Sequence, residues 1–184
     1  KTNLDNKKNK TFTVVWIGTP STSSYLQGII PILNKLKDEI NINIKLIGSD
    51  KNLLNQLNCE FVEWDVNNEV REISECHLGI MPLHDTMWEL GKCGYKILQY
   101  MALKLPVVAS PVGVNKEIIK DNNNGMLANN ENEWYDQISL LLDDNKLMNK
   151  ISNNGYETVL KNFNIENYKM QYLNILKSLL RIKI

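Results

Sequence analysis

Residues 91–115, GKCGYKILQYMALKLPVVASPVGVN, constrain the fold of this chain more than any other stretch. A glycine-bounded loop leads into an amphipathic helical pattern, then a short apolar run, and then a Ser-Pro-Val-Gly turn that opens another helix. The apolar run is of the kind found in a strand that is covered on both faces. A helix that feeds such a strand is half of a βαβ crossover, which predicts an α/β fold with a parallel sheet.

The remaining segments continue this alternation of strand and helix. We expect strands at residues 11–18, 43–47, 60–64, 77–81, 106–109 and 126–128. We expect helices at residues 21–40, 53–57, 66–74, 95–103, 117–121, 130–142, 151–163 and 168–180. The hydroxyls of Ser21, Ser23 or Ser24 are candidate caps for the first helix. This order predicts a doubly wound parallel β-sheet of about six strands flanked by helices, with a helical C-terminal tail.

The apolar positions of two helices predict which faces are buried. In the helix after Gly94, the expected buried residues are Tyr95, Leu98, Tyr100, Met101 and Leu103. In the last helix, the apolar face consists of Tyr172, Leu173, Leu176 and Leu180. We expect the tail helices to support the core.

Charge and cysteine content exclude several classes of protein. The formal net charge is zero, so bulk charge does not favour nucleic acid as a partner. Three cysteines, Cys59, Cys76 and Cys93, are widely spaced and lack CxxC spacing, which argues against a disulfide framework and a zinc site. The sequence contains no run long enough to span a bilayer and no signal-peptide core. We therefore expect a cytoplasmic protein.

The loop before the helix of residues 95–103 predicts an anion site. Lys92, Cys93 and Gly94 precede that helix, so backbone N–H groups and the positive end of the helix dipole face a ligand above the loop. Lys96 and Gln99 lie three residues apart and project from one side of the first turns. Ammonium, amide and helix N-terminus can therefore converge on one ligand.

This segment resembles the donor-binding half of GT-B glycosyltransferases, most closely the retaining class called family 4, or glycosyl transferases group 1. The residues that match its pattern are Gly94, Met101, Ala102, Pro106, Val107, Val108, Ala109, Ser110, Gly113 and Glu117. The Asn-Gly turn and short strand near residue 125 also resemble the family, and the likeness extends over about residues 14–163. It implies a Rossmann-like half of a GT-B fold that binds a nucleoside-diphosphate sugar, with UDP or GDP as the nucleotide.

The resemblance also implies how the chain is divided. We expect residues 1–10, rich in Lys and Asn, to be a flexible leader or linker, and residues 11–184 to form one donor-binding domain. In the family an acceptor-binding half precedes this one, so we expect the chain to be a fragment of a longer enzyme. The isolated domain should then be inactive alone.

Two glutamates of the family pattern are replaced in this chain. They fall on Gly91 and Gln99. In the family the first contacts the donor sugar and the second contacts the ribose hydroxyls. The amide of Gln99 can still hydrogen-bond a ribose diol, whereas Glu89 would take the place of the first glutamate only if the loop bulges. The resemblance thus makes Glu89 and Lys92 the catalytic candidates, with Lys92 beside the departing diphosphate.

Other strand ends supply further candidates, each with a simpler alternative. Gly18 and Thr19 follow the first strand, where the hydroxyls either contact phosphate or only cap a helix. Trp64 stacks on the nucleotide base or, as the more ordinary expectation, is a core tryptophan on a strand. His84 and Asp85 share one loop and are expected to be turn residues rather than a catalytic pair.

These features lead to a hypothesis with two alternatives. We expect retaining transfer of a sugar to a glycan or lipid-linked acceptor, in bacterial surface polysaccharide, lipopolysaccharide or capsule synthesis. A metal-binding Asp-x-Asp is missing at a suitable place, so we expect no cofactor and metal independence, with lysines in place of the metal. The basic and apolar ending at residues 177–184 is a weak signal for contact with the inner face of the membrane. The alternatives are a catalytically silent nucleotide-sugar-binding module and another GT-B enzyme, such as a nucleotide-sugar epimerase.

Overall fold

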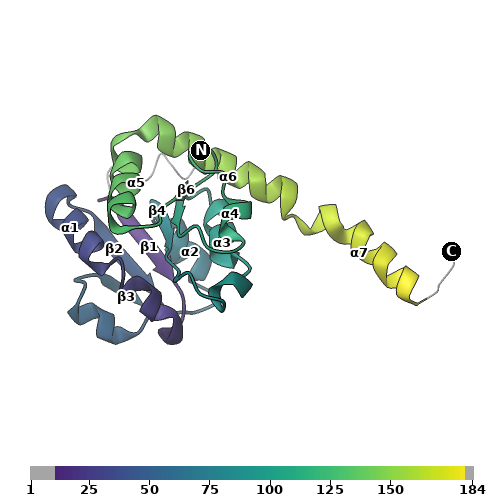
Figure 1. Cartoon of the computed structure of the whole chain (residues 1–184), viewed down its shortest axis with the longest axis horizontal. Helices are drawn as coiled ribbons and strands as arrows, with labels where there is room; N and C mark the ends of the chain where they lie inside the picture. Colours follow the sequence, from purple (N-terminus) through teal and green to yellow (C-terminus); the bar gives the residue numbers. More distant parts are fainter. Residues whose placement is uncertain (1–10, 181–184) are drawn as a thin grey trace.

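Six parallel strands form the centre of the molecule, in the order β3-β2-β1-β4-β5-β6 (Figure 1). The computed structural model describes residues 11–180, so the expected leader and the last four residues of the 177–184 segment lie outside the described residues. The strands are β1 (Thr13–Ile17), β2 (Asn43–Ile47), β3 (Glu60–Val62), β4 (Leu78–Met81), β5 (Val107–Ala109) and β6 (Met126–Leu127). This is the order of a doubly wound sheet, and it confirms the predicted fold class.

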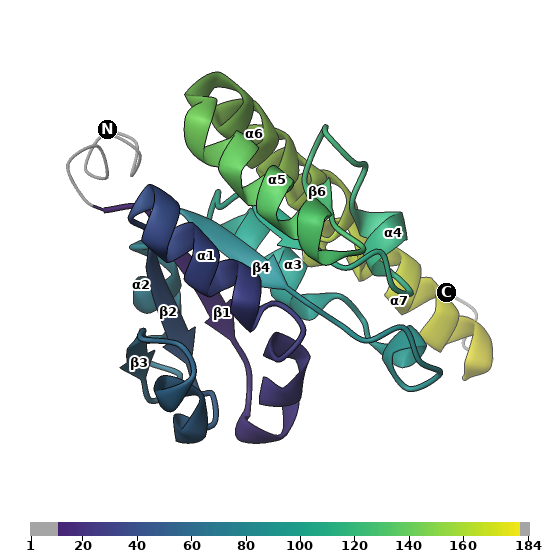
Figure 2. The ribbon, with the colours of Figure 1, turned by 60° about the vertical axis from the view of Figure 1, so that its left-hand side comes forward.

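Helices cover both faces of this sheet (Figure 2). The α-helices are α1 (Ile30–Ile40), α2 (Glu69–Ser74), α3 (Tyr95–Ala102), α4 (Asn115–Ile118), α5 (Glu131–Asp143), α6 (Asn145–Asn162) and α7 (Ile165–Leu179). The short 3-10 helices are η1 (Pro20–Leu26), η2 (Lys51–Asn55) and η3 (Glu89–Gly91). Apolar residues of α1 and α5 pack with Val14 and Trp16 of β1, whereas those of α2 and α3 pack with Val15 and Ile17. The alternation of side chains along β1 therefore supplies one core to each face.

The first predicted helix is divided into two elements. Residues 20–26 form η1, and α1 begins only at Ile30. Pro31 lies in the first turn of α1, where its missing N–H is tolerated, but its ring prevents the helix from extending backwards. The expected serine caps are thus wrong for α1, because Thr19 is the N-cap of η1 and Ser23 accepts a hydrogen bond from the Asp50 N–H at 2.8 Å.

The C-terminal helices differ in what they bury. In α5, Trp134, Ile138 and Leu141 are buried as expected. In α7 none of the residues is buried, and Tyr172 is 67% exposed, so the expected core support from this helix is wrong. Figure 1 shows α7 leading away from the sheet. An amphipathic pattern specifies a face that can be buried, but not whether its partner lies in the same domain. Across residues 11–180, no helix is long and apolar enough to cross a membrane.

Tyr100 of α3 fills the point where β1 and β4 separate. The ladder between these strands pairs Val15 with Gly79, and beyond it the Tyr100 hydroxyl lies between the two backbones. It accepts a hydrogen bond from the Ile17 N–H at 3.2 Å and donates one to the Ile80 carbonyl at 3.3 Å. A Cβ on Gly79 would lie 2.3 Å from the Tyr100 ring, so only glycine leaves room for it. Complete burial raises the pKa of this phenol well above its ordinary value.

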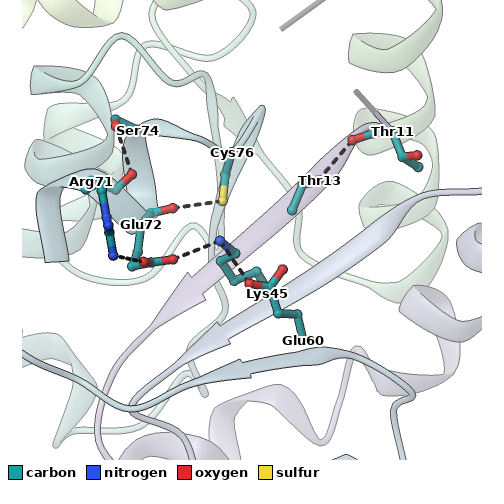
Figure 3. Close-up of polar contacts among 8 residues, drawn as sticks. All are labelled: Thr11, Thr13, Lys45, Glu60, Arg71, Glu72, Ser74 and Cys76. Carbon is teal, nitrogen blue, oxygen red and sulfur yellow. Dashed lines mark hydrogen bonds and ion pairs between the residues drawn. The ribbon is translucent and has the colours of Figure 1, made fainter. Parts of the chain in front are cut away.

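A buried lysine fixes α2 and β3 against β2 (Figure 3). The Lys45 ammonium lies 3.0 Å from the Glu72 carboxylate and 3.1 Å from that of Glu60, and Arg71 also pairs with Glu72 at 2.8 Å. Burial alone would lower the pKa of Lys45, but the hydrogen bonds to Glu72 and Glu60 outweigh it and raise that pKa. The same contact with Lys45 lowers the pKa of Glu72. One cation therefore holds the start of β3 and the middle of α2 in place.

Replacing the Tyr100 hydroxyl tests how much the junction of β1 and β4 depends on it. We expect Tyr100→Phe to lower the free energy of unfolding by about 1–3 kcal/mol, because buried backbone groups lose their partner. Urea denaturation measures this loss. Tyr172→Phe, which removes a hydroxyl from an exposed ring of α7, should leave the midpoint unchanged; equal losses in the two variants would contradict the bridging role.

Candidate functional site

The carboxyl ends of β1, β2 and β3 meet at two glycines. The Gly18 N–H donates to the Ile47 carbonyl at 3.0 Å, and the Gly48 N–H donates to the Val62 carbonyl at 2.9 Å. Gly48 has a φ of +69°, and a Cβ there would lie 2.5 Å from the Gly18 carbonyl oxygen and 3.0 Å from the Trp64 Cβ. Because Gly48 has no side chain, the Gly18 backbone and Trp64 can both lie close to it.

The hydroxyls after Gly18 are engaged with one another. The Thr19 N–H donates to the Thr22 hydroxyl at 3.0 Å, and the Thr19 and Ser21 hydroxyls lie 2.9 Å apart. Thr19 and Thr22 form a capping box at the start of η1. The capping interpretation is therefore confirmed for Thr19, and contact with a phosphate stays a prediction.

Trp64 is not the core residue that the sequence favoured. Strand β3 ends at Val62, so Trp64 lies in the following loop and is 54% exposed. Its indole N–H donates to one carboxylate oxygen of Glu69, and the Gln99 amide donates to the other. Sequence reasoning missed Glu69, because an acidic residue in the first turn of a helix is an ordinary feature. The side chains of Trp64 and Gln99 are brought together through it.

Gly94 begins α3 in a conformation that requires glycine. Its φ is +69°, and a Cβ there would lie 2.4 Å from the Ile118 side chain. The Ile97 N–H donates to the Gly94 carbonyl at 3.0 Å, so the amides before Ile97 precede the intrahelical ladder and face the loop. Cys93 beside it is exposed. Tyr95 is 63% exposed, contrary to expectation, because it points outward from the first turn.

Two lysines place positive charge above this turn. The Lys96 ammonium lies 4.9 Å from the centre of the Trp16 ring, and that of Lys92 lies 5.7 Å from the rings of Tyr25 and Trp88. Burial, together with the nearby Lys92 charge, lowers the pKa of Lys96 to about 8. Within residues 11–180 neither lysine forms an ion pair with a carboxylate. Unpaired cations beside a helix N-terminus favour an anionic ligand.

Glu89, three residues before Lys92, has a carboxylate that is already hydrogen-bonded. It is 5% exposed, and it accepts hydrogen bonds from Thr86 and, at 2.7 Å, from the Tyr25 hydroxyl. The contacts with Thr86 and Tyr25 lower the pKa of Glu89. Burial and this hydrogen bond raise the pKa of Tyr25 to about 12. The His84 ring meets the Tyr25 ring edge-on, with 5.3 Å between the ring centres.

A concave region lies at the amino ends of the strands, opposite the candidate residues. A polar hollow of about 590 Å³ is lined by residues such as Asn41, Asn58 and Cys59, at the amino ends of β2 and β3. The candidate residues described above lie at the carboxyl ends, where parallel sheets bind ligands. Groups of three or more His, Cys, Asp or Glu that could hold a metal ion do not occur among residues 11–180.

The Gly94 turn can be tested against a nearby glycine. Gly94→Ala should lower the free energy of unfolding by about 1–3 kcal/mol, because alanine is strained at positive φ and its Cβ meets Ile118. Gly91→Ala is the matched control, since a Cβ there meets nothing within 4 Å. Chemical denaturation of both variants measures the difference; a Gly94→Ala protein as stable as Gly91→Ala would show that the turn tolerates a side chain.

Comparison with known proteins identifies the family. The family described as glycosyl transferases group 1 matches residues 11–144. An uncharacterized glycosyltransferase of Methanocaldococcus jannaschii is 28% identical over 143 residues, which are 71% of this chain and 39% of that protein. The chain thus spans about two fifths of the length of this curated relative.

Solved structures show the same fold. The C-terminal domain of LpcC, a glycosyl transferase group 1 protein of Francisella tularensis, is 22% identical with a TM-score of 0.67, covering 89% of this chain and 92% of that one. HepE of Anabaena, solved in complex with UDP, is 18% identical with a TM-score of 0.79, covering 91% of this chain and 49% of that one. The chain therefore belongs to the glycosyl transferases group 1 family, and its sheet is the Rossmann-like half of a GT-B fold.

Proposed function

We propose that this chain is the donor-binding domain of a glycosyltransferase and that its donor is a nucleoside-diphosphate sugar. The observation that carries the proposal is the pair of unpaired lysines, Lys92 and Lys96, beside the N-terminus of α3 at the carboxyl edge of the sheet. A diphosphate matches this arrangement, because it carries the charge that both lysines and the free amides can stabilise. HepE, which has this fold, was solved with UDP and with UDP-glucose.

In this proposal the protein acts mainly on the leaving group. Negative charge grows on the diphosphate as the bond to the sugar breaks, and donors fixed in advance stabilise that charge. Lys92 and the backbone amides of Cys93 and Gly94 are the groups placed for this role. We propose that these cations make transfer independent of a metal ion, and that transfer retains the configuration of the sugar.

Glu89 is the carboxylate that precedes Lys92 by three residues. The hydrogen bonds from Tyr25 and Thr86 keep Glu89 ionised and fixed. We propose that it faces the donor sugar, in the role that the family gives to a glutamate at the position of Gly91. The acceptor, a glycan or lipid-linked molecule of a surface polysaccharide, would be bound by the rest of a longer enzyme at the cytoplasmic side of the membrane.

A silent binding module is the second candidate, and one observation favours it. Gly91 has no side chain, and a Cβ there would meet nothing within 4 Å, so the family's first glutamate is replaced by open space. Such a module would bind a nucleotide sugar without transferring it. If the full-length wild-type protein transfers sugar and its Glu89→Gln variant does not, this candidate is excluded.

Thermal-shift measurements with UDP, GDP, ADP and their sugar conjugates test donor binding. A nucleotide at about one hundred times its dissociation constant adds roughly 2.7 kcal/mol of stability, which shifts the midpoint by several degrees. We expect one nucleotide to give this shift with and without a divalent metal, and Lys92→Ala to reduce it. Lys150→Ala removes an exposed lysine of α6 and should retain the full shift. If none of the nucleotides stabilises the chain, donor binding by this domain is refuted.

The lowered pKa of Lys96 predicts proton uptake when the diphosphate binds. Near pH 8.5 Lys96 is mostly neutral in the free domain, because its pKa is about 8. A bound anion favours the charged form and raises that pKa, so the complex takes up a proton, and affinity falls as the pH rises above about 8. Calorimetry in buffers with different ionisation enthalpies measures the uptake. Lys96→Met should abolish it; binding heats independent of the buffer in wild type would contradict the assignment.

A further inference from the structure

We propose that Glu69 binds the ribose hydroxyls of the nucleotide and thereby selects ribonucleotides over deoxyribonucleotides. This inference rests on the proposed function, since it assigns one end of the nucleoside-diphosphate site. It begins with an exposed indole, a carboxylate and an amide that come from three different segments and meet at the carboxyl edge of the sheet. The sequence indicated the indole and the amide as candidates, but not the carboxylate of Glu69 that joins them.

The indole defines the kind of ligand that fits here. Trp64 is 54% exposed in the loop after β3, and the lack of a Cβ on Gly48 leaves the room that the Trp64 Cβ occupies. The hydrogen bond from its ring nitrogen to Glu69 fixes the orientation of the ring. A flat, exposed and oriented aromatic face is suited to stacking with a nucleobase.

The carboxylate of Glu69 retains capacity for a ligand. It accepts one hydrogen bond from Trp64 and one from Gln99, whereas an ionised carboxylate offers about four acceptor positions. The side chain is only half-buried, so the remaining positions are accessible. Because the Gln99 amide nitrogen points to Glu69, its carbonyl oxygen is also left as an acceptor. Two neighbouring acceptors match the two hydroxyl donors of a ribose diol.

The position of Glu69 is set by contacts outside the site. Glu72, one turn later on α2, pairs with the buried Lys45 of β2 at 3.0 Å (Figure 3). Gln99 lies one residue before Tyr100, whose hydroxyl is hydrogen-bonded to the backbones of β1 and β4. Both partners of the diol are thus carried on helices that are fixed to the sheet, so the acceptors are oriented before the ligand arrives.

The order of the candidate residues along α3 matches the order of groups in a nucleoside diphosphate. Lys96 precedes Gln99 by one turn on the same helix, and Gly94 lies at its start. The base would therefore lie over Trp64 and the ribose over Glu69 and Gln99. The diphosphate would lie over Lys96 and the N-terminus of α3.

Comparing ribo- and deoxyribonucleotides separates this role from a merely structural one. Calorimetry would measure the binding of UDP and 2′-deoxy-UDP, and of the matching guanosine and adenosine pairs, to wild type, Glu69→Gln and Glu75→Gln. Glu75 lies at the other end of α2 and its substitution removes the same charge. We expect wild type and Glu75→Gln to bind the ribonucleotide at least about tenfold more tightly, since a hydrogen bond to a charged group is lost with the 2′-hydroxyl.

The Glu69→Gln variant decides the assignment. If Glu69 binds the diol, this variant binds both nucleotides with the affinity that wild type has for the deoxyribonucleotide. If the variant keeps the tenfold preference for the ribonucleotide, the inference is overturned while donor binding stands. The same holds if the variant binds both nucleotides equally more weakly than wild type, because a displaced Trp64 would explain that loss. A wild type without preference would also overturn the inference. If wild type binds none of the six nucleotides, the proposed function itself fails and this inference with it.

Discussion

The hydroxyl of Tyr100 holds the junction on which the rest of the structure depends. At a topological switch point two neighbouring strands have their crossovers on opposite faces, so the strands separate and their backbone groups need other partners. Tyr100 provides one for the Ile17 N–H and one for the Ile80 carbonyl. Ligands of open α/β sheets bind at such a point, beyond the carboxyl ends of the strands. Because the same residue belongs to α3, the packing that closes the core also sets the positions of Lys96 and Gln99.

Much of the fold could be predicted from local pattern. The strand predicted at residues 43–47 is reproduced residue for residue as β2, in which Ile44, Leu46 and Ile47 are buried apolar residues typical of a strand. Lys45 interrupts the apolar run, and its burial is possible because it pairs with Glu60 and Glu72. Helix starts with a local signal were also predictable, as Asn130 shows by capping α5 through the Glu133 N–H at 3.0 Å. The split between η1 and α1 carried such a signal in Pro31, which the helical spacing of the leucines and isoleucines masked.

What the sequence did not reveal depends on contacts between distant segments. The prediction of Trp64 as a core residue assumed that β3 extends to residue 64. The strand instead ends at Val62, where its pairing with β2 ends. Glu69 gains its significance from Gln99, thirty residues away on another helix. The place of Lys92 and Gly94 before α3, by contrast, was predictable, because a glycine that precedes a helix and the charge beside it are features of one short stretch. Their role in binding an anion stays a prediction. For α7 the pattern was read correctly as amphipathic, but the burial it predicted is missing.

The lysines above α3 make the candidate site a place where binding and folding have opposite requirements. In the folded domain the pKa of Lys96 is about 8, below its value in an unfolded chain, so the charged form costs stability at neutral pH and this cost disappears only as the pH rises through and above 8. A neutral side chain at this position would raise the stability of the domain without ligand and would weaken its affinity for an anion. Screening variants for heat resistance alone would therefore favour neutral residues at position 96 and would select against anion binding.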